Sequence, residues 1–147
     1  MLNDAQIMIR LILATVLGGL VGLERQIHQR SAGLRTHILV SLGSCLIMLT
    51  SLYVFDIYNK ITPLDPSRIA AWVITGIGFL GAGAIIREKE KVIGLTTAAS
   101  LWVVAGIGLA IGCGFYIAGF FTTVIALAVL FCLRVFERFL FSRIEKG

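Results

Sequence analysis

The sequence predicts an all-α membrane protein whose five transmembrane helices form a single domain over residues 1–147. The main observation is the stretch from Val92 to Leu133, which contains no charged side chain and is interrupted only by the turn Gly112-Cys113-Gly114. One bilayer crossing needs about 20 apolar residues, so this stretch is long enough for two. The composition agrees, because 58% hydrophobic and 14% charged residues leave too little polar surface for a soluble protein of 147 residues.

The remaining spans follow from the same test of length and charge. We expect the first helix at about residues 5–23, an apolar run in which Arg10 is the one charged residue. The second and third are expected at residues 38–55 and 69–86, which carry no charge. The glycine turn divides the long stretch into helices at residues 95–111 and 115–133. Residues 134–147 mix aromatic and aliphatic residues with arginines, which predicts an amphipathic tail lying at the inner leaflet.

The distribution of lysine and arginine predicts that the N-terminus lies outside and the C-terminus in the cytoplasm. Cytoplasmic connections retain positive charge, and this orientation places ten of the 13 basic residues inside. The inner ones are Arg25, Arg30, Arg35, Arg87, Lys89, Lys91, Arg134, Arg138, Arg143 and Lys146. The outer ones are Arg10, Lys60 and Arg68. Because the cations flank membrane spans, we expect the lipid bilayer and its anionic lipids as partners, and no nucleic acid.

Small residues indicate how the helices pack. In lipid, helices associate through close backbone approach, which glycine allows. We therefore expect the helices at residues 5–23, 69–86 and 95–111 to form a tight centre and the last helix to face lipid or a second subunit, giving a homodimer or a complex with another membrane protein. The glycines assigned to packing are Gly18, Gly22, Gly78, Gly81, Gly83, Gly108 and Gly112. The run from Gly76 to Gly81 matches GxGxxG, but it lies inside an apolar helix and not after a strand, so it predicts no dinucleotide site.

One dense group of polar residues lies in the inner connections. It comprises Glu24, Arg25, Gln26, Arg35, Thr36, Arg87, Thr96 and Thr97. These residues have two interpretations. In the first they serve structure, with Glu24 paired to Arg25 or Arg35, arginines bound to headgroups, and Thr36 and Thr96 capping helices. In the second they converge into a functional site, because charges this close to the hydrocarbon are costly unless they are paired or used.

Glu24 is the candidate metal ligand of the chain. None of the eight acidic residues lies in the middle of a predicted span, and magnesium prefers carboxylate oxygens together with retained water. This favours an inner-face site or gate over a buried cation cage. No Ser/His/Asp or Cys/His arrangement with supporting context and no zinc-ligand spacing occurs, so we expect no catalytic residue, no bound cofactor and no enzyme activity.

Five motifs together resemble the MgtC/SapB family of bacterial membrane proteins, and the match runs from Gly18 to about Gly114. They are Gly22-Leu-Glu24-Arg25-Gln26, Ala32-Gly33-Leu34-Arg35-Thr36-His37, Asp65-Pro66-Ser67-Arg68-Ile69, Gly76-Ile-Gly78-Phe-Leu-Gly81-Ala-Gly83 and Gly94-Leu-Thr96-Thr97-Ala-Ala-Ser-Leu-Trp102. Their order and spacing make the resemblance specific.

The resemblance implies a multi-pass protein of the bacterial inner membrane linked to magnesium homeostasis, with virulence roles in some members. Members of this family have been described as magnesium transporters, or as regulators that bind other membrane complexes such as the ATP synthase. We therefore expect transport of magnesium or a related solute, with a non-transporting regulator as the alternative. Longer members carry a soluble C-terminal domain, whereas this sequence ends at Gly147, so we expect its function to lie in the membrane unit.

Overall fold

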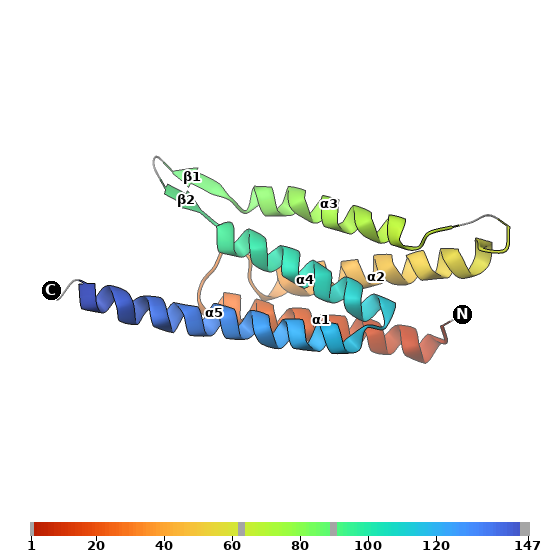
Figure 1. Cartoon of the computed structure of the whole chain (residues 1–147), viewed down its shortest axis with the longest axis horizontal. Coiled ribbons are helices and arrows are strands. Elements are labelled where there is room, and N and C mark those ends of the chain that lie inside the picture. Colours follow the sequence, from red (N-terminus) through yellow and green to blue (C-terminus); the bar gives the residue numbers. More distant parts are fainter. Residues whose placement is uncertain (1, 62–63, 89–90, 145–147) are drawn as a thin grey trace.

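The computed structural model describes residues 2–61, 64–88 and 91–144, with side chains described except at residue 88 and residues 133–144. This part of the chain forms five helices and one short hairpin (Figure 1). The elements in order are α1 (Asp4–Ile27), α2 (Leu34–Tyr58), α3 (Ser67–Gly83), β1 (Ile86–Glu88), β2 (Lys91–Ile93), α4 (Leu95–Cys113) and α5 (Tyr116–Ile144).

The helices run up and down beside one another, so the connections gather at two ends of the molecule (Figure 1). The hairpin end holds the α1–α2 turn at residues 28–33, the β1–β2 hairpin and the start of α4. The opposite end holds the N-terminus, the α2–α3 connection and the α4–α5 turn. Three helices, α1, α2 and α4, are long and apolar enough to cross a membrane. The described apolar parts of α3 and α5, Ser67–Gly83 and Tyr116–Cys132, are shorter.

The helices extend beyond the predicted apolar runs, mainly at the hairpin end. The first helix continues to Ile27 and α2 begins at Leu34, because polar residues continue the helical hydrogen bonding past the apolar segment. At the other end, Asn3 caps α1: its Oδ1 accepts from the backbone N–H of Gln6 at 3.0 Å, while the Gln6 side chain accepts from Asn3 N–H at 3.2 Å.

The centre of the bundle lies where α1, α2 and α4 meet. Ala14, Val21, Cys45 and Val104 have no exposed surface, and Ile107 keeps only 1%. These residues form one contiguous apolar cluster that draws on all three helices. The prediction that the third helix belongs to the tight centre was wrong, since α2 takes that place.

Glycines permit the close approach of these central helices. A Cβ at Gly18 would lie 2.5 Å from Ser41 Cβ, and one at Gly22 would lie 2.8 Å from His37 Cβ, so α1 meets α2 at both positions. In α4, a Cβ at Gly108 would overlap the carbonyl oxygen of Ser41, and one at Gly112 would lie 2.7 Å from Met48 Cβ. All four glycines are therefore at helix contacts that a larger residue would separate.

The glycines of α3 are placed differently. Its contacts with α4 rest on Val73 and Ile77, which pack against Ala105. A Cβ at Gly81 would make an ordinary contact of 3.6 Å with Ala98. A Cβ at Gly78 or Gly83 would meet no described atom within 4 Å. The packing role predicted for these two glycines thus has no partner within the described chain, because α3 turns another side toward its neighbours.

The third helix ends three residues before its predicted end, and Ile86, its last predicted residue, begins a strand. Helix α3 ends at Gly83, and β1 pairs antiparallel with β2 so that Ile86 lies opposite Ile93 and Arg87 opposite Val92. The hairpin enters α4 through Gly94, whose φ of +96° and closeness to Ala84 exclude a side chain. In the predicted tail the backbone of α5 remains helical to Ile144, while the side chains that would make it amphipathic lie outside the described residues.

Candidate functional site

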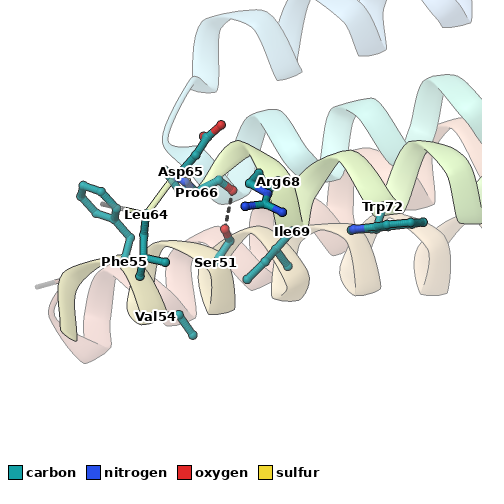
Figure 2. A pocket seen from close by; sticks show the side chains of 9 residues that line it. All are labelled: Ser51, Val54, Phe55, Leu64, Asp65, Pro66, Arg68, Ile69 and Trp72. Carbon is teal, nitrogen blue, oxygen red and sulfur yellow. Dashed lines mark hydrogen bonds between the residues drawn. The ribbon is translucent and has the colours of Figure 1, made fainter. Parts of the chain in front are cut away.

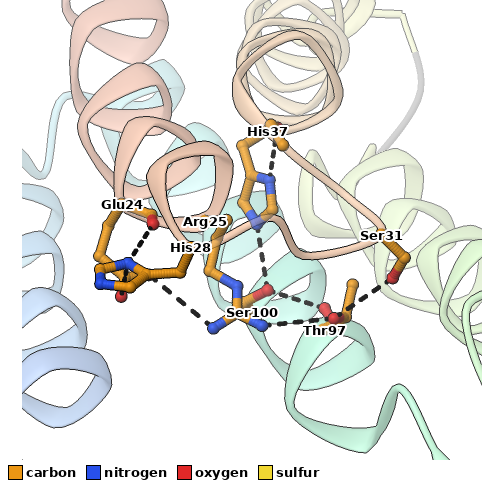
Figure 3. Close-up of polar contacts among 8 residues, drawn as sticks. Glu24, Arg25, His28, Ser31, His37, Thr97 and Ser100 are labelled. Carbon is orange, nitrogen blue, oxygen red and sulfur yellow. Dashed lines mark hydrogen bonds and ion pairs between the residues drawn. The ribbon is translucent and has the colours of Figure 1, made fainter. Parts of the chain in front are cut away.

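A network of polar side chains, most of them buried, lies at the hairpin end, where the end of α1, the start of α2 and the start of α4 meet (Figure 3). The participating side chains are those of Glu24, Arg25, His28, Ser31, His37, Thr97 and Ser100. Sequence separations of 63 to 72 residues between bonded partners mean that the tertiary fold, and not local sequence, assembles the network.

Glu24 and Arg25 are the charged pair of this network. Their side chains are only 9% and 3% exposed, with Glu24 Oε2 lying 3.8 Å from Arg25 Nη1. A shorter contact of 3.1 Å joins Glu24 Oε1 to Nδ1 of His28, one helical turn further on. The same His28 nitrogen lies 2.8 Å from the backbone oxygen of Glu24. The carboxylate is thus held between a guanidinium and an imidazole and is nearly closed off from solvent.

Arg25 links α1 to the first turn of α4. Its Nη2 donates to Oγ1 of Thr97 at 3.3 Å, and Ser31 in the α1–α2 turn donates to the same oxygen at 3.5 Å. Arg25 and Thr97 are only 2% and 3% exposed, so this link is desolvated. A buried charge of this kind is tolerated when it is paired and hydrogen-bonded, which fixes the guanidinium in place.

His37 connects the next turn of α4 to α2. The ring is fully buried, with Nδ1 lying 2.9 Å from the backbone oxygen of Gly33 and Nε2 lying 3.0 Å from Oγ of Ser100. Because a carbonyl only accepts, Nδ1 carries the hydrogen, and Nε2 of a neutral ring must accept from Ser100. The Ser100 hydroxyl also lies 2.8 Å from the backbone oxygen of Thr97. Its single hydrogen therefore serves one of these two acceptors at a time.

A pocket of about 630 Å³ opens beside this network. Arg25, Arg30 and Ser31 line it from the end of α1 and the α1–α2 turn. Gly94, Thr96 and Thr97 line it from the start of α4, and apolar residues of β2 and α5 complete its wall. The pocket therefore combines positive charge, hydroxyl groups and a helix N-terminus.

Only part of the sequence-predicted polar site converges here. Glu24, Arg25 and Thr97 form the network, and Thr96 lines the adjoining pocket. The other four predicted residues, Gln26, Arg35, Thr36 and Arg87, lie apart from this network. Gln26 Oε1 accepts from Leu34 N–H at 3.4 Å, while exposed Arg35 and Thr36 line a groove between α2 and α3. Arg87 lies exposed in β1.

The predicted capping roles of Thr36 and Thr96 were wrong. Both threonines lie inside the first turn of their helices, and the capping positions belong to Gly33 and Gly94, which provide no side-chain cap. The turn before α4 demands glycine, because Gly94 has a φ of +96° and a side chain there would overlap the Ala84 backbone, whereas a Cβ at Gly33 would meet the flexible end of the Gln26 side chain. Neither capping glycine offers a side chain to the first backbone N–H groups of its helix, although Leu34 N–H at the start of α2 donates to Gln26 Oε1 at 3.4 Å.

The described residues contain no group of three His, Cys, Asp or Glu side chains close enough to hold a metal ion. Glu24, the predicted ligand, lies beside a histidine and an arginine. This arrangement offers one carboxylate to a cation, which suits a hydrated ion making a single contact better than a dehydrated ion in a protein cage.

Sequence reasoning assigned no functional or structural polar role to Ser100 or Arg10, and it expected His37 in a solvated loop position, although the ring is fully buried. Arg10 lies at the opposite end, only 8% exposed, where Nη1 donates to the backbone oxygen of Gly112 at 2.7 Å and Nε donates to the Tyr116 hydroxyl at 3.1 Å. All three lie at or within apolar runs, so composition hides them. One available pattern was the spacing of Thr97 and Ser100, which places two hydroxyls on one side of α4.

A second, smaller pocket of about 260 Å³ lies at the opposite end, between α2 and the start of α3 (Figure 2). Ser51 donates a hydrogen bond to the backbone oxygen of Pro66, and Arg68 and Trp72 border the cavity. Asp65 precedes α3 and accepts from the backbone N–H of Ser67 at 2.8 Å. The Ser67 side chain and this N–H both lower the pKa of the Asp65 carboxyl. The contacts of Ser51 and Asp65 fix the α2–α3 connection.

Comparison with known proteins places the chain in a family. A model of the MgtC family matches residues 11–139, which is most of the sequence. This chain belongs to the MgtC family. All of the network residues described above fall within the matched segment. No solved structure matches the chain.

Three relatives illustrate this MgtC-family membership. The chain is 47% identical over 145 residues to the protein of Escherichia coli K12 named "Putative magnesium transporter YhiD", covering 97% of the chain and 66% of that protein. It is 45% identical over 126 residues to Protein MgtC of Salmonella typhimurium LT2, covering 86% and 52%. It is 44% identical over 117 residues to Protein SapB of Bacillus subtilis, covering 77% and 50%. The chain thus spans between half and two thirds of the length of these relatives.

Proposed function

We propose that this MgtC-family chain is a protein of the bacterial inner membrane that crosses the bilayer five times, with its N-terminus outside and its hairpin end in the cytoplasm. Helices α1, α2 and α4 are long enough to span alone, and the 17 residues of α3 reach the lower limit of about 17 residues for a crossing. The described basic residues support this orientation. Arg25, Arg30, Arg35, Arg87 and Lys91 lie toward the hairpin end, against Arg10, Lys60 and Arg68 toward the other.

We further propose that the chain acts in magnesium homeostasis by moving magnesium or a related solute across this membrane. The observation that carries the proposal is the position of Glu24, a nearly buried carboxylate at the hairpin end of α1. The name of the E. coli relative agrees with such a role. Because the described side chains offer one buried carboxylate there, a magnesium ion would keep most of its water and meet Glu24 as it enters or leaves the bundle.

A liposome assay tests this proposal. The purified chain, its Glu24→Gln variant and an Asp4→Asn variant are reconstituted separately, and magnesium entry is followed with an internal dye. Asp4 is a matched control because it is an exposed acid at the other end of the same helix. We expect entry with the unchanged chain and with Asp4→Asn, and strongly reduced entry with Glu24→Gln. Folded protein that admits no magnesium would contradict transport of this ion, and normal entry with Glu24→Gln would remove Glu24 from the path.

A regulator that binds another membrane complex, such as the ATP synthase, is the second candidate. The observation that favours it is the apolar surface of α3, where Phe79 is 82% and Trp72 is 73% exposed and Gly78 meets no described neighbour. Small residues beside large exposed apolar ones suit a helix from a second copy or another protein. Co-purification with the ATP synthase, compared between the unchanged chain and a Gly78→Leu variant, tests this candidate. Loss of a complex in the variant would support it.

A further inference from the structure

We propose that the pocket at the start of α4 binds a phosphate group, either free phosphate or the phosphodiester of an anionic lipid headgroup. This site is distinct from a cation path, and the proposal does not depend on which solute the chain moves. It rests on the charge of the lining residues, on the local structure of α4 and on the size and lining of the cavity.

Positive charge predominates around the pocket. Arg25 and Arg30 both line it, and neither arginine loses its charge at physiological pH. Among the described side chains, Glu24 is the acid beside them: its Oε2 lies 3.8 Å from Arg25 Nη1 and its Oε1 lies 3.1 Å from His28 Nδ1, so two guanidinium groups stand against one described carboxyl group. The planar guanidinium of arginine can donate two parallel hydrogen bonds to the oxygens of a phosphate group. The hydrogen bond to Thr97 holds the Arg25 guanidinium in position before any ligand arrives.

The first turn of α4 adds neutral donors to this charge. Residues Leu95, Thr96 and Thr97 occupy its first three positions and line the pocket, and Gly94 provides no side-chain cap for them. The N–H groups of a first helical turn have no partner within the helix, and the aligned peptide dipoles make this end attractive to anions. The hydroxyls of Ser31, Thr96 and Thr97 lie on the same lining. A tetrahedral phosphate offers enough acceptor oxygens to use several of these donors at once.

The size of the pocket favours an ester over a bare ion. Its volume of about 630 Å³ exceeds what a phosphate alone would fill. Apart from Gln29 in the α1–α2 turn, the remaining wall is apolar, with Val92 and Ile93 from β2 and Val129 and Leu130 from α5. A phosphate ester would therefore place its phosphate at the arginines and its less polar part along this apolar wall. A lipid headgroup of the adjacent leaflet has this chemistry, and free phosphate would use the polar part alone.

Two probes distinguish these sources. In the first arm, the full chain in a neutral detergent and phosphate-free buffer of about 0.1 M salt is titrated calorimetrically with inorganic phosphate, since the salt screens nonspecific surface attraction. In the second arm, the chain is reconstituted in vesicles of phosphatidylglycerol and phosphatidylcholine and extracted gently. The lipid that remains bound is then quantified by mass spectrometry.

Arg30→Gln is the main variant, because Arg30 lines the pocket yet is exposed and its loss should not prevent folding. Arg87→Gln is the matched control, since Arg87 is an exposed arginine at the same end that does not line the pocket. Thr96→Val removes one donor with little change of shape and serves if Arg30→Gln does not fold. We expect Arg30→Gln to weaken binding about tenfold, because it removes a charge-assisted hydrogen bond to the phosphate. Thr96→Val should weaken binding about threefold, because it removes a hydrogen bond from a neutral hydroxyl. Arg87→Gln should change binding by less than about twofold.

Each outcome decides the proposal. Saturable phosphate binding that depends on Arg30 identifies a site open to free phosphate. Selective retention of phosphatidylglycerol with the same dependence, but no phosphate binding, identifies a headgroup site. Equal weakening by Arg30→Gln and Arg87→Gln would mean that a basic surface attracts anions without a site. Folded protein that binds neither probe would overturn the proposal. Neither a failure to bind phosphate nor a failure to retain phosphatidylglycerol bears on magnesium entry, which the Glu24→Gln experiment measures separately.

Discussion

Arg10 shows how a single buried cation can join two distant parts of the chain. Its guanidinium lies 102 residues in sequence from Gly112, whose backbone oxygen it reaches at 2.7 Å at the end of α4. A positive charge is favourable at a helix C-terminus, where carbonyls have no partner within the helix. The same side chain donates to the Tyr116 hydroxyl and lies 5.8 Å from the centre of that ring. Arg10 therefore ties α1 to the α4–α5 turn.

Tyr116→Phe should lower the free energy of unfolding by about 1.5 to 3 kcal/mol, the range for a hydrogen bond to a charged group. The Arg10 Nε would lose its acceptor at 3.1 Å while remaining mostly buried. Thermal unfolding of the purified chain in detergent measures the change. Tyr53→Phe is the control, because Tyr53 is 59% exposed and no side-chain hydrogen bond is seen for it among the described residues. If both variants unfold at the same temperature, the Arg10 contact contributes little to stability.

Asp65 predicts a pH dependence at the start of α3. The Ser67 side chain and N–H hold the pKa of this carboxyl below its ordinary value of 3.8. A carboxyl with a lowered pKa in the folded state stabilises the fold above the ordinary value, and that contribution is lost as the pH falls through the folded pKa. We expect Asp65→Asn to lower the unfolding temperature slightly near pH 7 and to have no effect once the pH is well below 3.8. A difference that persists unchanged in acid would contradict this role of the charge.

At the scale of elements, the contact of α2 with α4 sets the centre of the bundle. Gly108→Ala should lower the free energy of unfolding by about 1 to 3 kcal/mol, because the added methyl would overlap the Ser41 backbone and push the helices apart. Gly106→Ala is the matched control in the same helix, since a Cβ there meets no described atom within 4 Å. It should be neutral or slightly stabilising, as alanine favours helix over glycine by up to about 1 kcal/mol. Equal unfolding temperatures for the two variants would mean that the close contact between α2 and α4 does not lie at Gly108.

The elements also show which features the sequence could reveal. Uncharged runs predicted all five helices in order, because length and hydropathy are local properties. The glycines of α3 were assigned to packing although Gly78 and Gly83 have no partner, since a small residue marks the possibility of a contact and not the neighbour. The β1–β2 hairpin was missed because each strand has only three residues and half of the six are charged, so the segment resembles a polar connection.

In the polar site, too, the sequence reveals features that depend on neighbouring residues and misses contacts between residues far apart in the chain. Glu24, Arg25 and Thr97 stood out because they lie in polar segments or motifs at the ends of apolar runs. The contact between His37 and Ser100 was not predicted, although both residues lie in the motifs, because the tertiary fold brings the pair together: 63 residues separate the imidazole from the hydroxyl that it meets. Buried polar groups must be satisfied, yet a sequence does not show by which neighbour.

At the scale of the whole molecule, the up-and-down order of the helices makes the proposed orientation testable with the native cysteines. Cys113 is exposed in the α4–α5 turn, whereas Cys45 is buried. One variant keeps only Cys113, with alanine at the other two cysteine positions. We expect a membrane-impermeant maleimide to label this variant in spheroplasts, which keep an intact inner membrane. A second variant that carries one cysteine at exposed Ser31, in the α1–α2 turn, should react only after the membrane is opened. The reverse pattern would invert the topology and place the Glu24 network and the proposed phosphate pocket outside the cell. Labelling of both positions from outside would contradict the antiparallel crossing of α1 and α4, because these two turns lie at opposite ends of the bundle (Figure 1).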